Sequence, residues 1–318
     1  MKITRLCPAK INLFLEVTGK RPNGYHELVT LFAKISLTDT LTVEAVPTSE
    51  SAPISLELSG PQAALIPAGT DNLVCKAAQG FLAHFHLHAR ITLHLEKHIP
   101  TGAGLGGGSS DAAGVLLCLC HLFDKNPLEL LPLAAQLGAD VPLFLYPDTF
   151  LRGEGIGEKL TPVVFAKTLP ELVLVYPKVA VSTKEVFAHI KISPQQEILT
   201  NLSKLNKLIG AVENGMPFVN WKPLLFNKLE EYVFPSAPSV RQAFDKLVCL
   251  SGGVCRMSGS GSTVFALVGT KLDALKITKQ LEDTEVLVYP VSFYKEPTSA
   301  NYRDKNSSNG RGTLKSFC

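Results

Sequence analysis

Residues 100–113 combine five glycines with two serines, and an apolar segment follows directly. Glycines place no side chain between a ligand and the backbone, and they allow the positive φ angles that turn successive N–H groups inward. The apolar segment predicts a helix, whose N-terminal N–H groups and dipole favour an anion at the same place. Ser109 and Ser110 could cap this helix or reach a phosphate oxygen or its metal ion. We therefore predict a phosphate-binding loop, with the candidate residues Pro100, Thr101, Gly102, Ala103, Gly104, Leu105, Gly106, Gly107, Gly108, Ser109 and Ser110.

The spacing of the glycines distinguishes between several kinds of phosphate loop. Gly102, Gly104 and Gly107 satisfy the Gly-x-Gly-x-x-Gly fingerprint, but a dinucleotide-binding fold also needs an acidic residue after a second strand about 20 residues later. The stretch 127–137 has a helical pattern instead. No lysine follows the glycines as in a Walker loop, and the chain contains neither the His-Arg-Asp nor the Asp-Phe-Gly motif of protein kinases. A flexible linker fits poorly, because solvated linkers do not run straight into an apolar helix.

Metal-ligating residue types are present but not grouped. His84, His86 and His88 alternate, yet no nearby cysteine or carboxylate completes a ligand set. We therefore predict no metal site made by the protein alone. The seven cysteines are scattered and never spaced as Cys-x-x-Cys, which favours buried free thiols in a reducing compartment.

Alternating strand and helix patterns must position these residues. In the segment 10–17 the residue types alternate, which predicts a strand with Lys10, Asn12, Phe14 and Glu16 on one face and Ile11, Leu13, Leu15 and Val17 on the other. The turn signal at 21–24 leads directly into Tyr25 and His26. Further strands are predicted at 41–46, 54–58, 91–95, 172–176, 263–268 and 286–293. Helices are predicted at 73–85, from the glycines to about 121, in a segment that stops at 138, at 223–250 with breaks at two prolines, and at 272–281.

Length and composition indicate two domains. The chain has 318 residues, of which 46% are apolar, so it can build two hydrophobic cores. The sequence texture changes beyond residue 149, and we expect an α+β protein with one domain at 1–150 and a second at 151–293. Residues 294–318 are polar and lack apolar periodicity, which predicts a disordered tail.

The same features argue against two classes of partner. The net charge is +3 and no basic stretch is interleaved with aromatics, so we expect no nucleic-acid partner. No apolar run approaches 18 residues, and the N-terminus resembles neither a signal nor a transit peptide. We therefore expect no membrane association and a cytoplasmic protein, present as a monomer or a weak homodimer.

Three motifs, in their order and spacing, resemble those of the GHMP kinases, a family of small-molecule kinases. They are Pro-Ala-Lys-Ile-Asn-Leu at 8–13, Gly-Leu-Gly-Gly-Gly-Ser-Ser at 104–110 and Ser-Gly-Ser-Gly at 258–261. Four further segments narrow the resemblance to the members that phosphorylate 4-diphosphocytidyl-2-C-methyl-D-erythritol: 24–26, 70–73, 137–142 and 155–158. The resemblance covers residues 3 to about 293.

This resemblance implies a fold and a reaction. The fold would be an N-terminal ribosomal-protein-S5-like ATP-binding domain followed by a C-terminal ferredoxin-like domain. The reaction would transfer the γ-phosphate of ATP to the 2-hydroxyl of that cytidine-linked alcohol, in the non-mevalonate route to isoprenoid precursors. Mg²⁺ would bridge the ATP phosphates, and Ser110 could help to hold it.

The resemblance also implies roles for individual residues. Asp140 would be the base that faces the substrate hydroxyl, with Lys10 beside it to keep the carboxylate ionised and to stabilise the attacking oxygen. Without the resemblance, Asp140 reads as a helix cap and Lys10 as a solvated charge. The substrate-binding residues would be Asn12, Tyr25, His26, Thr183 and Phe187, with the cytosine ring bonded to His26 and stacked between Tyr25 and Phe187.

Two alternatives and two departures stay open at this point. A related kinase of homoserine or mevalonate would need no aromatic sandwich, and a non-catalytic nucleotide-binding protein would bind ATP without releasing ADP. Asp111 places a negative charge beside the phosphate loop, where it would oppose ATP if it turned inward. The segment 193–217 resembles the family only weakly.

Overall fold

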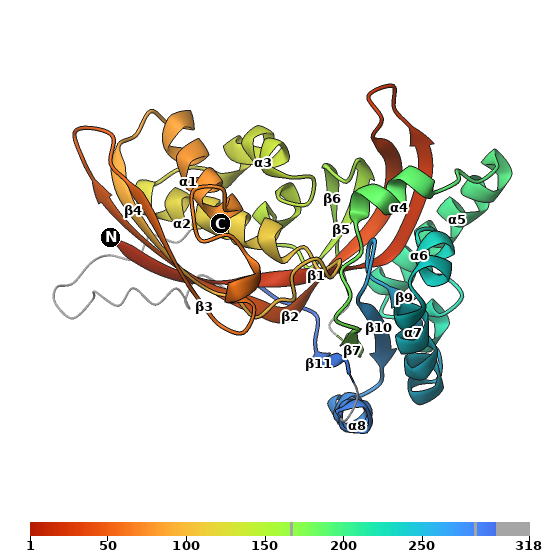
Figure 1. Ribbon diagram of the computed structural model, residues 1–318. Helices are drawn as coiled ribbons and strands as arrows, with labels where there is room; N and C mark the ends of the chain where they lie inside the picture. The colour runs from red at the N-terminus through yellow and green to blue at the C-terminus, as the bar shows by residue number, and fades with distance from the viewer. Residues whose placement is uncertain (166–167, 283–284, 297–318) are drawn as a thin grey trace.

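A long, bent sheet built around two neighbouring strands organises the first half of the chain (Figure 1). The computed structural model describes residues 1–165, 168–282 and 285–296. The strand order of this sheet is β3-β4-β2-β1-β8, and β5 pairs with β2 while β6 pairs with β5. Its strands are β1 (Lys2–Lys20), β2 (His26–Pro47), β3 (Ile54–Ser59), β4 (Ala89–Glu96), β5 (Phe150–Gly155), β6 (Lys159–Val163) and β8 (Phe226–Asn227).

Helices cover one face of this sheet (Figure 1). The central helix α2 contacts α1, β1 and β2, and it is buried along most of its length because its residues are apolar or small on nearly every side. The sequence predicted the helices α1, α2 and α3 to within a few residues. The helices of this half are η1 (Ala63–Leu65), α1 (Leu73–His84), α2 (Gly107–Phe123), η2 (Pro127–Leu130), α3 (Leu131–Leu137) and η3 (Pro142–Leu145).

A β-bulge in β1 alters the predicted pattern of its two faces. The register to β2 shifts between Asn12 and Phe14, so the side chains beyond this point change sides. Lys10 and Asn12 do share a face, as predicted. The prediction that Phe14 and Glu16 lie on that face is wrong, because Leu15 lines the cavity described below while Glu16 is hydrogen-bonded to Asn201 of the later helix α5 (Gln195–Glu213).

The second sheet has four antiparallel strands in the order β11-β7-β10-β9. Helix α7 packs against β10 and α8 against β11, which confirms the α+β class. The strands are β7 (Glu171–Tyr176), β9 (Cys255–Met257), β10 (Val264–Val268) and β11 (Leu287–Val291). The helices are α4 (Thr183–His189), α5 (Gln195–Glu213), η4 (Phe218–Trp221), α6 (Glu230–Ser236), α7 (Pro238–Ser251) and α8 (Lys271–Leu281).

The chain passes from the first sheet to the second later than residue 150, the position at which the sequence predicts a domain boundary. β5 pairs with β2 over Leu28–Ala33, so the chain stays in the first sheet until Val163. The second sheet begins at Glu171. The later strand β8 then returns to pair with β1, so the two sheets do not divide the chain at a single point.

The start of the predicted tail is packed against the first sheet. The backbone N–H of Tyr294 donates to the carbonyl of Lys34, and the hydroxyl of Thr149 donates to the carbonyl of Tyr294. Glu296 forms an ion pair with Arg5 at 2.5 Å. The prediction of a disordered tail from residue 294 is therefore wrong for these residues, and residues 297–318 lie outside the described part of the chain.

Candidate active site

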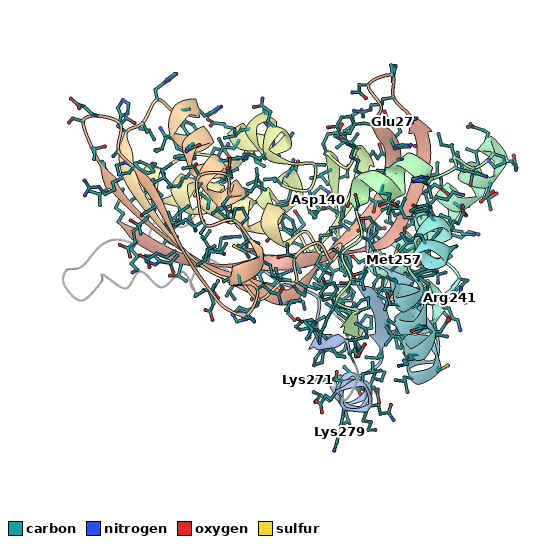
Figure 2. All side chains as sticks on the ribbon, in the orientation of Figure 1. Glu27, Asp140, Arg241, Met257, Lys271 and Lys279 are labelled. Atoms are coloured by element: carbon teal, nitrogen blue, oxygen red, sulfur yellow. The ribbon has the colours of Figure 1, made fainter. Side chains whose placement is uncertain are left out.

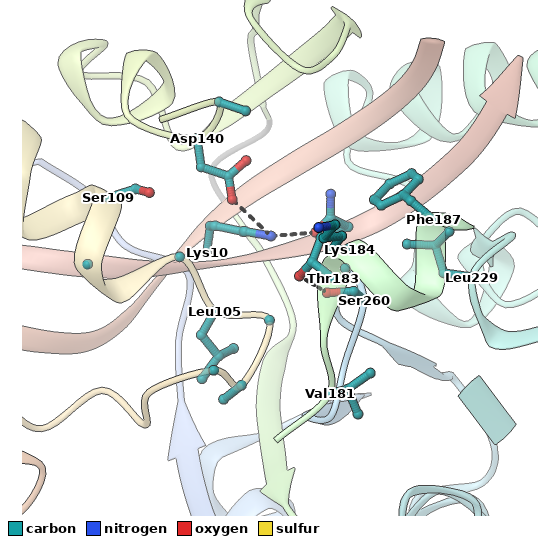
Figure 3. A pocket seen from close by; sticks show the side chains of 18 of the residues that line it. Lys10, Leu105, Ser109, Asp140, Val181, Thr183, Lys184, Phe187, Leu229 and Ser260 are labelled. Carbon is teal, nitrogen blue, oxygen red and sulfur yellow. Dashed lines mark hydrogen bonds and ion pairs between the residues drawn. The ribbon is translucent and has the colours of Figure 1, made fainter. Parts of the chain in front are cut away.

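A cavity of about 1010 Å³ lies where β1, the glycine-rich loop and α4 meet (Figure 3). The first half of the chain contributes β1, the residues 100–109 and Asp140, and the second half contributes α4 and the loop at 259–260. Of the predicted site residues, Ser110 alone does not line the cavity. The fold thus gathers residues from distant segments at one opening.

The glycine-rich loop leaves the N-terminus of α2 uncapped. Gly102, Gly104 and Gly106 have positive φ angles of 68°, 76° and 69°, which other residues rarely adopt. Gly106 is the N-cap residue and supplies no side-chain hydrogen bond, so the first N–H groups of α2 remain available to an anion. Ser109 and Ser110 lie inside the helix and do not cap it.

A second loop holds the glycine-rich loop in place. The hydroxyl of Ser258 donates to the carbonyl of Gly104 at 2.9 Å, and the N–H of Thr263 donates to the carbonyl of Ala103 at 3.2 Å. A Cβ atom on Gly104 would lie 2.3 Å from the carbonyl oxygen of Ser258, so only glycine permits this approach. The Ser-Gly-Ser-Gly motif therefore packs against the glycine-rich loop and fixes its shape.

A buried charge cluster lies beneath the same loop. The ammonium of Lys97 bonds to Asp111 at 2.8 Å and also to Asp39, and all three side chains are almost fully buried. Burial alone would lower the pKa of Lys97, but the two carboxylates outweigh it and raise that pKa. Asp111 is thus directed at Lys97, and burial raises the pKa of Asp111 and favours its neutral form, so this carboxyl adds little negative charge beside the loop.

Lys10 and Asp140 meet at the centre of the cavity (Figure 3). Their Nζ and Oδ2 atoms are 3.5 Å apart, and Lys10 is almost fully buried while the side chain of Asp140 is 31% exposed. The ammonium of Lys10 also donates to Oδ1 of Asn12 at 2.9 Å. Asp140 follows α3 in a turn, and the next helix, η3, has Val141 as its N-cap residue without a side-chain bond. The helix-cap interpretation of Asp140 is therefore wrong.

Aromatic side chains gather at the other end of the cavity. The rings of His26 and Phe187 lie 5.4 Å apart between centroids, and Tyr25 is 59% exposed beside them. Burial and the charge of Lys20 lower the pKa of His26, so its imidazole is neutral at pH 7. A neutral imidazole can both donate and accept a hydrogen bond, as the edge of a nucleobase requires.

Helix α4 connects the two ends of the cavity. The hydroxyls of Thr183 and Ser260 are 2.7 Å apart, which joins α4 to the Ser-Gly-Ser-Gly loop. Lys184 lines the cavity beside Thr183 and was not predicted from the sequence, because nothing local distinguishes it from a solvated lysine. The available signal was the separation of Thr183 and Phe187 by one helical turn, which predicts a helix with one face toward the site.

Metal-ligand clusters and membrane-spanning helices are both absent from the residues that the structure describes. In the described part of the chain, no three histidine, cysteine or acidic side chains are arranged to hold a metal ion. None of the helices in these residues has the length and apolarity needed to cross a lipid bilayer.

Comparison with family models gives two matches. Residues 72–148 match the model of the GHMP kinases N terminal domain, and residues 208–285 match that of the GHMP kinases C terminal. The first match contains the glycine-rich loop and Asp140, and the second contains the Ser-Gly-Ser-Gly motif.

Individual proteins are similar over most of the chain. The 4-diphosphocytidyl-2-C-methyl-D-erythritol kinase of Persephonella marina is 36% identical and covers 87% of this chain and 95% of its own length. The enzyme of the same name from Bacteroides thetaiotaomicron is 38% identical, covering 81% of this chain and 89% of its own length.

Solved structures agree with these similarities. A crystal structure of 4-(cytidine 5'-diphospho)-2C-methyl-D-erythritol kinase superposes with a TM-score of 0.72 at 34% identity, covering 91% of this chain and 99% of the other. Homoserine kinase from Cytophaga hutchinsonii reaches 0.71 at 16% identity, over 93% and 96% of the two chains, and so shares the fold alone. These relationships confirm that the chain belongs to the 4-diphosphocytidyl-2-C-methyl-D-erythritol kinases of the GHMP kinase family.

Proposed function

We propose that this protein transfers the γ-phosphate of ATP to the 2-hydroxyl of 4-diphosphocytidyl-2-C-methyl-D-erythritol, a step of the non-mevalonate route to isoprenoid precursors. One observation carries the proposal: the Lys10–Asp140 pair lies in the same cavity as the uncapped N-terminus of α2. Phosphoryl transfer needs a held polyanion, a base for the hydroxyl and a positive charge near the attacking oxygen. This cavity offers all three.

Asp140 accepts the proton of the substrate hydroxyl in this proposal. Its carboxylate is partly exposed to the cavity, so a bound alcohol can reach it. The ammonium of Lys10, fixed by Asn12, stabilises the negative charge that develops on the attacking oxygen. The N–H groups at the start of α2 bind the ATP phosphates, with the residues 100–109 as the rest of the nucleotide site.

Mg²⁺ fits this site as a companion of ATP. Ser110 follows the last loop residue that lines the cavity, and its buried hydroxyl has no hydrogen-bond partner in the described residues, so we assign it as the candidate protein ligand. The ion supplies neutralisation of phosphate charge when it is bound with ATP. Lys97 pairs with both Asp39 and Asp111, and burial raises the pKa of Asp111 and so favours its neutral form, which leaves little net negative charge beneath the loop.

The cytidine end of the substrate belongs at the aromatic end of the cavity. We assign Tyr25 and Phe187 to the two faces of the cytosine ring and His26 to its polar edge, with Thr183 beside the alcohol. The partner is thus a small molecule. Five of the six described cysteines are buried free thiols, which supports a cytoplasmic enzyme, and we expect a monomer or a weak homodimer.

A coupled ADP-release assay tests this proposal with three alcohols: the cytidine-diphosphate-linked methylerythritol, homoserine and mevalonate. We expect rapid release only with the first. Preference for homoserine or mevalonate would replace the proposed substrate, and ATP binding without ADP release from any of the three would indicate a non-catalytic protein.

The variant Asp140→Asn tests the base. We expect turnover to fall by about 10²- to 10⁴-fold because the proton acceptor is lost, while ATP affinity stays within about twofold. Asp245→Asn is the matched control, since Asp245 pairs with Arg241 on α7 away from the cavity (Figure 2). Near-normal turnover of Asp140→Asn would remove Asp140 from this role.

A further inference from the structure

One face of α4 spans the distance between the two ends of the cavity. Thr183, Lys184, Phe187 and Ala188 all line it, at positions i, i+1, i+4 and i+5 of the helix. Thr183 contacts Ser260 at the end near Lys10, whereas Phe187 lies against His26 at the aromatic end. Lys184 therefore lies on the helix face that connects the two ends (Figure 3).

The cavity has an excess of positive charge on this side. Four lysines line it, namely Lys10, Lys20, Lys97 and Lys184, against the single carboxylate of Asp140. Lys10 is paired with Asp140, and Lys97 is held by two buried carboxylates. Within the described residues, the ammonium groups of Lys20 and Lys184 have no carboxylate at ion-pair distance. Both remain free to bind an anionic ligand.

Lys20 and Lys184 lie at different places along the cavity. Lys20 lies opposite His26 in the β1–β2 register, at the far end of the hairpin from Lys10. Lys184 lies between the Thr183–Ser260 contact and the Phe187 ring instead. A diphosphate that joins a nucleoside to an alcohol must lie between the sites of its two ends, which is the stretch that Lys184 borders.

We propose that Lys184 binds the diphosphate of the substrate and makes the enzyme select a diphosphate-linked alcohol over an uncharged one. This inference rests on the proposed function. An ammonium can form charge-assisted hydrogen bonds to phosphate oxygens, and an unpaired lysine forms them without first breaking an ion pair. Lys184 is thereby a specificity-determining residue that takes no part in proton transfer.

Steady-state kinetics of Lys184→Met test the proposal, because methionine keeps the unbranched apolar stem and loses the charge. We expect the KM for the cytidine-linked substrate to rise about five- to tenfold, while kcat and the KM for ATP stay within about twofold. Lys184→Arg should restore the substrate KM to within about twofold of the original. Lys279→Met on α8 is the matched control, since Figure 2 shows Lys279 far from Asp140.

Calorimetric binding of CDP and of cytidine provides a second readout that needs no turnover. The original protein should bind CDP more tightly than cytidine, and Lys184→Met should reduce this ratio about five- to tenfold by weakening CDP alone. An unchanged ratio, or a parallel rise in the KM for ATP, would overturn the assignment of Lys184. If the original protein turns over no cytidine-linked alcohol, the proposed function fails, and the CDP-to-cytidine ratio still decides whether Lys184 binds the diphosphate.

Discussion

Phe187 is the residue whose neighbours best indicate what the aromatic end of the cavity binds. Its ring lies against His26, and the exposed Tyr25 stands at the same end. The sequence left Phe187 open between a core residue and a substrate contact. Its partial burial and its place on the cavity wall favour the second interpretation.

Phe187→Leu tests this role. Leucine keeps most of the apolar volume but lacks a flat face, so we expect the KM for the cytidine-linked substrate to rise about tenfold and the KM for ATP to stay the same. Initial-rate kinetics measure both constants. Phe244→Leu is a matched control. The ring of Phe244 on α7 also packs against a second ring, that of Phe234 on α6. Unchanged saturation with the substrate would exclude Phe187 from the site.

At the scale of elements, the phosphate loop depends on a second loop for its shape. Gly104 has a positive φ angle and lies against the carbonyls of Ser258 and Gly261. Gly108, by contrast, lies in the first turn of α2, and a Cβ atom on it would meet nothing within 4 Å. The two glycines therefore differ in what they contribute to folding.

Gly104→Ala and Gly108→Ala separate these contributions. We expect Gly104→Ala to lower the free energy of unfolding by about 3 kcal/mol, because the new methyl group meets a backbone oxygen and the residue is strained at positive φ. Gly108→Ala should change it by less than about 1 kcal/mol. Urea unfolding measures both, and equal losses for the two variants would contradict the docking of the loops.

Much of this arrangement could be predicted from the sequence, and the remainder depends on long-range contacts. The glycines and the apolar run after them encode the loop and α2 locally. Helix α5 was missed although Ile198, Leu205, Leu208 and Val212 have helical spacing, because its other residues are strongly polar. The bulge after Asn12 and the pairing of Lys97 with Asp39 and Asp111 arise from register and topology, which no local pattern contains.

At the scale of the whole molecule, the end of the described chain returns to the first sheet beside a buried lysine. Lys34 is 2% exposed, its ammonium donates to the carbonyl of Tyr146, and its backbone bonds to Thr149 and Tyr294. Burial lowers the pKa of Lys34 to about 8. This side chain is thus a charge held where β2 and the segment after β11 meet.

The depressed pKa of Lys34 predicts how stability depends on pH. Between about pH 8 and 10.4 the unfolded chain keeps the proton that the folded protein has lost, so the free energy of unfolding rises with pH in this window. We expect the original protein to gain up to about 3 kcal/mol relative to Lys34→Met between pH 7 and 10.5. Urea unfolding at both pH values measures the gain, and a constant difference between the two proteins would contradict it.

The return of β8 to β1, together with the hydrogen bonds from Ser258 and Thr263 to the glycine-rich loop, bears on how this protein can be cut and rearranged. A truncated chain ending near Val163 would lose the edge strand β8 and the hydrogen bonds that hold the glycine-rich loop. The half of the chain that carries the glycine-rich loop is therefore no transferable module, and moving it to another protein would require the C-terminal half as well.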